Sequence, residues 1–163
     1  MSEKVVQVIL NTTNYISGST NNSASYYVDW AAILKPNMPY KLHFTYIGGQ
    51  NIYNGTKPAL VSINFNFDVF STSGTAIGAS SSNLIGYLKP IIITPASNTA
   101  FLTADTATNE PVYMERRPLN NNFTVSIVDV NGALWTDNNS TPAVPANWIM
   151  TLHFTEAERN YHN

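Results

Sequence analysis

Hydrophobic and polar residues alternate with a period of two along most of this chain. That period is typical of β-strands with one buried and one exposed face, and no window of a dozen residues holds the 3.6-residue period of an amphipathic helix. Clusters of Gly, Pro, Asn and Ser, which are typical of turns, separate the alternating runs. The pattern predicts eight strands, at residues 4–10, 25–30, 39–47, 59–67, 84–93, 111–116, 122–130 and 147–155.

Alternation also assigns the two faces of each predicted strand, because successive side chains of a strand point to opposite sides of the sheet. The apolar faces predict a core that includes Val6, Val8, Leu42, Phe44, Val125, Ile127, Leu152 and Phe154. The polar positions of the third and last strands then point outward: Lys41, His43, Thr45, Thr151, His153 and Thr155.

Several of the connections between these strands are too long for tight hairpins. Eight strands joined by long loops indicate two packed sheets with Greek-key connections, a sandwich or jelly roll, more than an up-and-down barrel. The composition does not shift along the 163 residues, so residues 1–163 are expected to form one domain.

Composition narrows the classes of function. The chain has no cysteine, which excludes disulfides, thiolate metal sites and a cysteine nucleophile. Charged residues are 11% of the chain and the net charge is −2, so binding to a nucleic-acid backbone is not expected. The 21 asparagines, 17 threonines and 14 serines predict a polar surface with little charge. Such a surface suits packing among copies of the same chain, although an AT-rich genome that favours Asn codons explains the asparagines equally well.

No membrane partner is expected either, because no segment approaches the ~18 consecutive apolar residues of a transmembrane helix. The first residues, MSEKVVQVIL, lack the apolar centre and the small-residue cleavage site of a signal peptide. We therefore expect a soluble protein made in the cytosol.

Motifs for catalysis or cofactor binding are weak. Asp29, Asp68 and Asp129 lie within or at the ends of predicted strands, where an Asp more often serves a turn than a reaction. His43, His153 and His162 are the only imidazoles, and tetrahedral zinc would need at least one more ligand. No phosphate-binding glycine motif is present. We expect no enzymatic activity, no metal and no cofactor.

Two loop features are candidates for contacts with other molecules. Arg116 and Arg117 form the only adjacent basic pair, and they serve either as a solvated loop corner or as donors to a neighbouring subunit. Trp135 lies between polar loop residues. It is either an exposed contact for a ligand or subunit, or a side chain packed beneath its loop.

Several segments together resemble a known family: VQVILNTTNY, YYVDWAAIL, PYKLHFTYIGG, ALVSINFNF, IGYLKP, ERRPLNNNFTVSIVDVNGALW and WIMTLHF. The chain resembles the single-jelly-roll minor capsid, or penton, proteins of virophages, polinton-like viruses and giant double-stranded DNA viruses. The pattern covers nearly the whole chain. Its most specific part is the order Arg-Pro-Leu, Asn residues, a strand, Asp-X-Asn-Gly, a loop and Trp-X-X-X-Leu-X-Phe.

The resemblance implies an all-β, eight-stranded single jelly-roll β-sandwich of two four-stranded antiparallel sheets, BIDG and CHEF. It also implies a homopentamer at the vertices of an icosahedral shell, in contact with the major capsid protein of the same virus. The protein would then be located in the virion after synthesis in the host cytoplasm. Strands D and I are neighbours in this topology, which would bring His43 and His153 together on the outer face. The interface candidates are therefore Arg116, Arg117, Trp135, His43 and His153.

Two other readings of an all-β chain stay open. One is a lectin-like jelly roll that binds carbohydrate or a receptor through Trp135 and nearby tyrosines. The other is a trimeric binding domain like those of the C1q and tumour-necrosis-factor group, although those are usually secreted. The chain has no room for the insertion domain that many penton proteins carry, which also leaves a cement role possible.

Overall fold

A computed structural model describes residues 4–55, 57–65, 71–75 and 78–158, and almost all of its regular elements are strands. In chain order the elements are β1 (Val5–Asn11), β2 (Ser23–Tyr27), α1 (Trp30–Ile33), β3 (Tyr40–Ile52), β4 (Ala59–Asn64), β5 (Ser71–Thr75), β6 (Gly78–Ser82), β7 (Leu84–Thr94), the 3-10 helix η1 (Pro95–Ser97), β8 (Thr99–Ala104), β9 (Val112–Met114), β10 (Asn122–Val128) and β11 (Trp148–Glu156).

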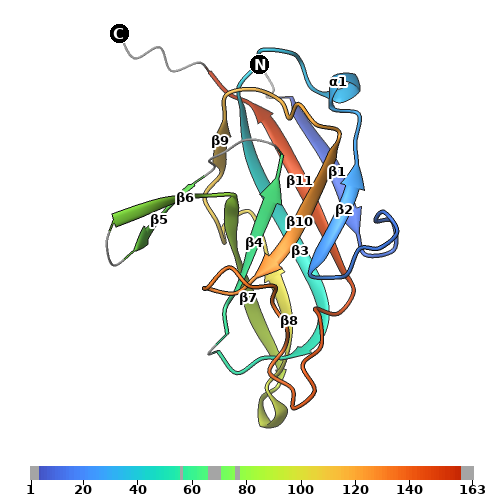
Figure 1. The fold of residues 1–163 in the computed structure, drawn as a ribbon, viewed down its shortest axis with the longest axis vertical. Helices are drawn as coiled ribbons and strands as arrows, with labels where there is room; N and C mark the ends of the chain where they lie inside the picture. Colours follow the sequence, from blue (N-terminus) through green and yellow to red (C-terminus); the bar gives the residue numbers. More distant parts are fainter. Residues whose placement is uncertain (1–3, 56, 66–70, 76–77, 159–163) are drawn as a thin grey trace.

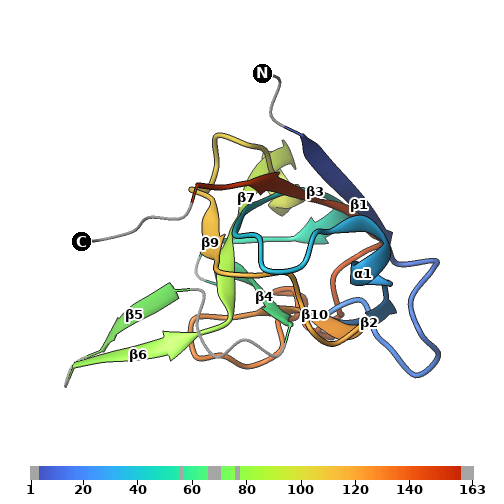
Figure 2. The same cartoon turned by 90° about the horizontal axis from the view of Figure 1, so that it is seen from above.

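Nine of the strands form one antiparallel sheet that curls into a barrel-like body (Figures 1 and 2). Neighbouring strands follow the order β1-β11-β3-β8-β7-β4-β10-β2, and the short β9 also pairs with β3. The long β7 joins the two halves, because residues 84–88 pair with β4 and residues 89–94 pair with β8. β5 and β6 pair with each other in a separate hairpin.

The prediction of an all-β chain is confirmed, whereas the predicted division into eight strands in two separate sheets is not. All eight predicted segments contain strands, but β8 and the β5–β6 hairpin lie in stretches that the sequence pattern assigned to loops. The inward positions of β8 are mostly small, Ala100, Leu102 and Ala104, and alanine has low β-propensity. Pairing with both β3 and β7 therefore decides that this segment is a strand.

Aromatic side chains fill the centre of the core. Trp30 lies 5.3 to 5.4 Å, between ring centroids, from Phe65, Phe123 and Phe154. The sequence pattern placed Trp30 at the end of a strand, but the strand ends at Tyr27 and Trp30 begins the one-turn helix α1. The helix turns the indole into the core, where its Nε1 donates to the Asn120 carbonyl at 3.1 Å.

The predicted core positions are confirmed for the central strands. Six of the eight residues are buried: Leu42, Phe44, Val125, Ile127, Leu152 and Phe154. Val6 and Val8 face the same core but are only partly buried. Their strand, β1, is at the margin of the sheet, so one flank of each side chain is not covered.

Candidate functional site

The outer face of β1, β11, β3 and β8 carries two of the five predicted contact residues. His43 of β3 and His153 of β11 are direct partners in the antiparallel register, and both are partly exposed. This confirms that they lie together on one outer face. It leaves their role in a subunit interface as a prediction.

A polar row crosses this face at His153. The imidazole Nδ1 is 3.2 Å from Gln7 Nε2 of β1, and the Nε2 is 3.5 Å from Thr45 Oγ1 of β3. Partial burial, and secondarily the positive charge that His43 can acquire, lower the pKa of His153 below its ordinary value. Neutral His153 can accept a hydrogen bond from the Gln7 amide, and this bond links β1 to β11.

Apolar side chains form a second row on the same outer face, closer to the ends of the strands. Ile149 of β11 and Ile47 of β3 are direct partners in the register, with 51% and 55% of their surfaces exposed. Phe101 of β8 pairs with Ile91 of β7, and Ile9 of β1, which is 67% exposed, lies diagonally beside Ile149. We call Ile9, Ile149, Ile47, Phe101 and Ile91 the apolar belt.

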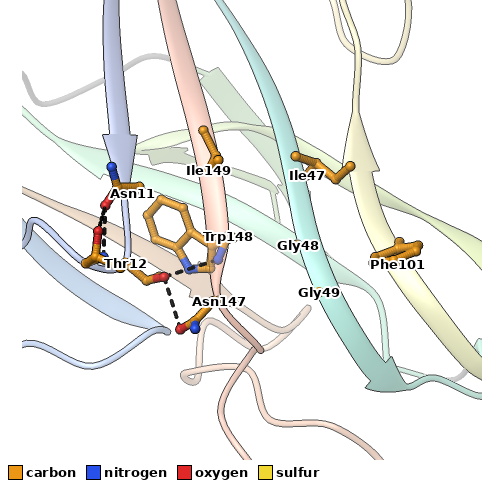
Figure 3. A pocket seen from close by; sticks show the side chains of 10 residues that line it. Asn11, Thr12, Ile47, Gly48, Gly49, Phe101, Asn147, Trp148 and Ile149 are labelled. Atoms are coloured by element: carbon orange, nitrogen blue, oxygen red, sulfur yellow. Dashed lines mark hydrogen bonds between the residues drawn. The ribbon is translucent and has the colours of Figure 1, made fainter.

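The apolar belt borders a shallow hollow of about 440 Å³ (Figure 3). Ile47, Phe101 and Ile149 line its apolar side. At its polar end, Thr12 Oγ1 donates to Asn147 Oδ1 at 3.2 Å and accepts from the Trp148 backbone N–H at 3.3 Å. Because its polar groups bond mainly to one another, the hollow offers a neighbouring molecule chiefly apolar surface and shape.

The adjacent arginines separate into two environments. Arg117 is partly buried, and its guanidinium donates to the Leu34 carbonyl at 2.8 Å. Since Leu34 is the C-cap of α1, Arg117 first stabilises this chain by holding α1 against the loop after β9. Arg116, the preceding residue, is exposed.

Trp135 is not an exposed contact residue. Its side chain is completely buried, and its Nε1 donates to the Lys57 carbonyl at 2.9 Å. Its backbone N–H also donates to the Ile127 carbonyl of β10 at 2.9 Å. The alternative that Trp135 packs beneath its loop is therefore correct, and an indole anchored in this way offers no surface to a subunit or sugar.

The possible catalytic and metal groups do not gather at one place. Asp129 accepts hydrogen bonds from the backbone N–H groups of Asn131 and Ala133, which is a turn function. Asp68 and His162 lie outside the described residues. Across the described ranges, no three His, Asp or Glu side chains are close enough to hold a metal ion, and no helix is long and apolar enough to cross a membrane.

Sequence reasoning missed the apolar belt, although part of its signal was visible. Ile9, Ile47 and Ile149 occupy outward positions of alternating strands, where a polar residue is expected. Phe101 gave no such signal, because its segment was assigned to a loop.

Neither a comparison with protein-family models nor a comparison with curated proteins finds a match for this chain.

Proposed function

We propose that this protein is a structural subunit of an icosahedral viral capsid, a single-jelly-roll protein of penton type that assembles as a homopentamer. In this role it contacts the major capsid protein of the same virus and carries out no reaction. Its role is structural: each copy presents complementary surfaces that contact its neighbours in a ring of five.

The observation that carries the proposal is the order of the strands. One half of the sheet runs β1-β11-β3-β8 and the other runs β2-β10-β4-β7. If β1, β2, β3, β4, β7, β8, β10 and β11 are taken as strands B to I, these halves read BIDG and CHEF. This is the arrangement that the resemblance to capsid proteins implies, with β5–β6 as an insertion between E and F and β9 as an addition.

The outer face of the BIDG half supports assembly as the function. Exposed apolar patches on a folded protein commonly mark contacts with other molecules. The apolar belt crosses β1, β11, β3, β8 and β7, and a neighbour that covered it would gain apolar burial as well as contact with the His43–His153 pair. A specific interface of standard size buries about 1,600 Å² in total, which requires a surface of this extent rather than one loop.

The direct test is the mass of the purified protein by light scattering and native mass spectrometry. We expect a particle of five chains of 18.0 kDa each, with ring-shaped images in negative-stain electron microscopy. A monomer at high concentration would contradict the proposal. A trimer would instead support the binding domain of the C1q and tumour-necrosis-factor type.

A matched pair of variants tests whether the apolar belt takes part. Ile47→Asp adds a charge in the middle of the belt, and Val130→Asp adds the same charge at a similarly exposed residue in the loop after β10. We expect Ile47→Asp to weaken assembly at least tenfold and Val130→Asp to leave it unchanged. Circular dichroism of both variants checks that the fold is retained.

A saccharide-binding module is the second candidate, supported by a hollow elsewhere on the molecule. Tyr87 and Tyr113, both about half exposed, line a hollow of about 460 Å³ together with Glu110. Exposed tyrosine rings and a carboxylate are suited to the apolar faces and hydroxyl groups of sugars. Binding on a glycan array that Tyr87→Ala and Tyr113→Ala abolish, by a protein that stays monomeric, would favour this function over the capsid role.

A further inference from the structure

Strand β1 has one paired edge and one free edge. The Thr12 N–H donates to the Trp148 carbonyl at 3.2 Å. In an antiparallel pair every second residue directs its backbone N–H and C=O groups to the partner strand, so this bond shows which residues of β1 bond to β11. The backbone groups of Val6, Val8 and Leu10 therefore point toward β11. Those of Val5, Gln7 and Ile9 point away from it. Among the described residues no strand pairs with this outward edge, and only its last carbonyl, that of Asn11, accepts hydrogen bonds, from the Asn14 N–H at 3.3 Å and the Tyr26 hydroxyl at 2.9 Å.

At the opposite end of the strand order, the edge of β2 is covered. The outward edge of β2 is covered by the chain's own segment 16–20. The Ile16 N–H donates to the Ser25 carbonyl at 2.8 Å, and Ser19 Oγ accepts from the Ser25 N–H at 3.0 Å. Folding therefore protects one margin of the sheet and leaves the other available.

The free edge of β1 lacks the usual protection against pairing with another chain. Exposed edge strands are commonly blocked by charged residues, proline or a bulge. The strand β1 has the sequence VVQVILN, without charge or proline, and its outward side chains include the exposed Val5 and Ile9. Because Ile9 belongs to the apolar belt, a strand added here would gain backbone hydrogen bonds and apolar burial together.

The β5–β6 hairpin offers a complementary edge on the opposite side of the same molecule. Both ribbon views show the hairpin projecting from the main body on the side away from β1 (Figures 1 and 2). Among the described residues its two strands pair only with each other, and an isolated two-stranded hairpin is marginally stable in water. Its strand sequences, STSGT and GASSS, carry no charge that would oppose docking on β1.

We propose that the free edge of β1 accepts the β5–β6 hairpin of a second copy of this chain, which extends the sheet from one subunit into the next. This inference rests on the proposed self-assembly and names the elements that make the contact. Because the two surfaces lie on opposite sides of one subunit, the contact is head-to-tail, and repetition closes a ring when the rotation from one subunit to the next divides a full turn.

Site-specific cross-linking tests the contact, and the absence of native cysteine makes the result unambiguous. Gln7→Cys is coexpressed with Ser73→Cys or with Ser80→Cys, one on each strand of the hairpin, and treated with a short bismaleimide. We expect a covalent dimer with at least one of the two hairpin variants. Gln7→Cys coexpressed with Val130→Cys is the control and should give none. A dimer formed through two Gln7→Cys chains would overturn the hairpin assignment, because it would indicate twofold pairing between β1 strands.

Hydrogen–deuterium exchange resolved to single amides separates this inference from the proposed function. In the assembled protein we expect the outward amides of Val5, Gln7 and Ile9 to exchange at least tenfold more slowly than in the dilute monomer. The inward amides of Val6, Val8 and Leu10 should be protected in both forms. A pentamer whose outward amides stay unprotected would overturn the strand addition and leave the capsid proposal standing. A dimer with protected outward amides and hairpin cross-links would support the strand addition and overturn the pentameric capsid proposal. A protein that is always monomeric would overturn both proposals.

Discussion

At the scale of single residues, buried polar groups connect the loops to the core. Each tryptophan is buried and donates its indole N–H to a loop carbonyl: Trp30 to Asn120 at 3.1 Å, Trp135 to Lys57 at 2.9 Å and Trp148 to Asn21 at 2.7 Å. A buried indole N–H needs such a partner, and each bond also fixes a loop that alternation alone left undefined.

Leu152 tests the packing of the central strand. It is completely buried on β11, so Leu152→Ala removes apolar contacts and leaves a cavity. We expect the free energy of unfolding, measured by urea denaturation, to fall by about 2 to 5 kcal/mol. The control is Ile149→Ala on the same strand, whose exposed side chain should change this value by less than about 1 kcal/mol when both variants are measured as dissociated chains. Equal losses for both variants would contradict the observed register.

A substitution at Tyr46 is expected to increase the free energy of unfolding. Its hydroxyl group is buried and has no hydrogen-bond partner within the described residues, and burial strongly raises its pKa. An unsatisfied buried hydroxyl costs about 1 to 3 kcal/mol. Tyr46→Phe is therefore expected to raise the free energy of unfolding by up to about this amount in thermal or urea denaturation. A loss of stability would mean that the hydroxyl has a partner, such as an ordered water.

At the scale of elements, irregular positions decide how strands meet. In β7, Gly86 has a φ of +156°, and the Asn109 side chain pairs with the neighbouring backbone like a strand residue. Its Oδ1 accepts from the Tyr87 N–H at 3.0 Å and its Nδ2 donates to the Tyr87 carbonyl at 2.9 Å. This contact covers the edge of β7 close to the point where the strand changes partners.

Gly86→Ala tests that arrangement. The added methyl group would overlap the Asn109 amide, and the positive φ is unfavourable for alanine. We expect a loss of about 1 to 3 kcal/mol in the free energy of unfolding. The same substitution in an Asn109→Ala background should cost less, because the overlap is removed. Gly132→Ala, with φ +80° and open space around it, measures the backbone cost alone.

The contact between β1 and β11 is expected to depend on pH. Because the pKa of His153 is lowered in the folded state, the unfolded chain binds more protons near its ordinary pKa of about 6.5. The contribution of neutral His153 to stability is thus present above about pH 6.5 and lost as the pH falls below it. The unfolding free energy of the wild type should decrease more between pH 7.5 and 5.5 than that of His153→Gln. Identical pH profiles would contradict this role.

At the scale of the whole molecule, sparse charge determines how copies can associate. The net charge is −2, and the ion pair between Lys35 and Glu156, 2.7 Å apart, lies at the surface, where such pairs contribute little. The apolar belt and the free edge of β1 also lack charged side chains. The proposed assembly would therefore depend on shape, apolar burial and backbone hydrogen bonds.

Salt provides the corresponding measurement. Salt screens attraction between charged surfaces, but it has little effect on apolar and backbone contacts. We expect the dissociation constant of the assembly, measured by sedimentation, to change less than about threefold between 50 and 500 mM sodium chloride. A dissociation constant that is tens of times larger at 500 mM than at 50 mM sodium chloride would instead indicate a charged interface.

The sequence by itself determined the all-β class, most strand positions and the inward face of the central strands. These features follow from local alternation, as Leu42, Phe44, Leu152 and Phe154 illustrate, because a period of two fits only a strand with one buried face. The meeting of His43 and His153 needed more than alternation, because it also required the topology that the family resemblance supplied.

Only the tertiary structure decided the features that depend on distant partners. The strand β8 exists because β3 and β7 lie on either side of it, and the buried Trp135 indole donates to the carbonyl of Lys57, which is distant in sequence. The belt that joins Ile9, Ile149, Ile47 and Phe101 depends on strand order, as does the contrast between the free edge of β1 and the covered edge of β2. A local pattern shows which way a side chain points, but the pairing of distant strands determines which surfaces meet and which remain open.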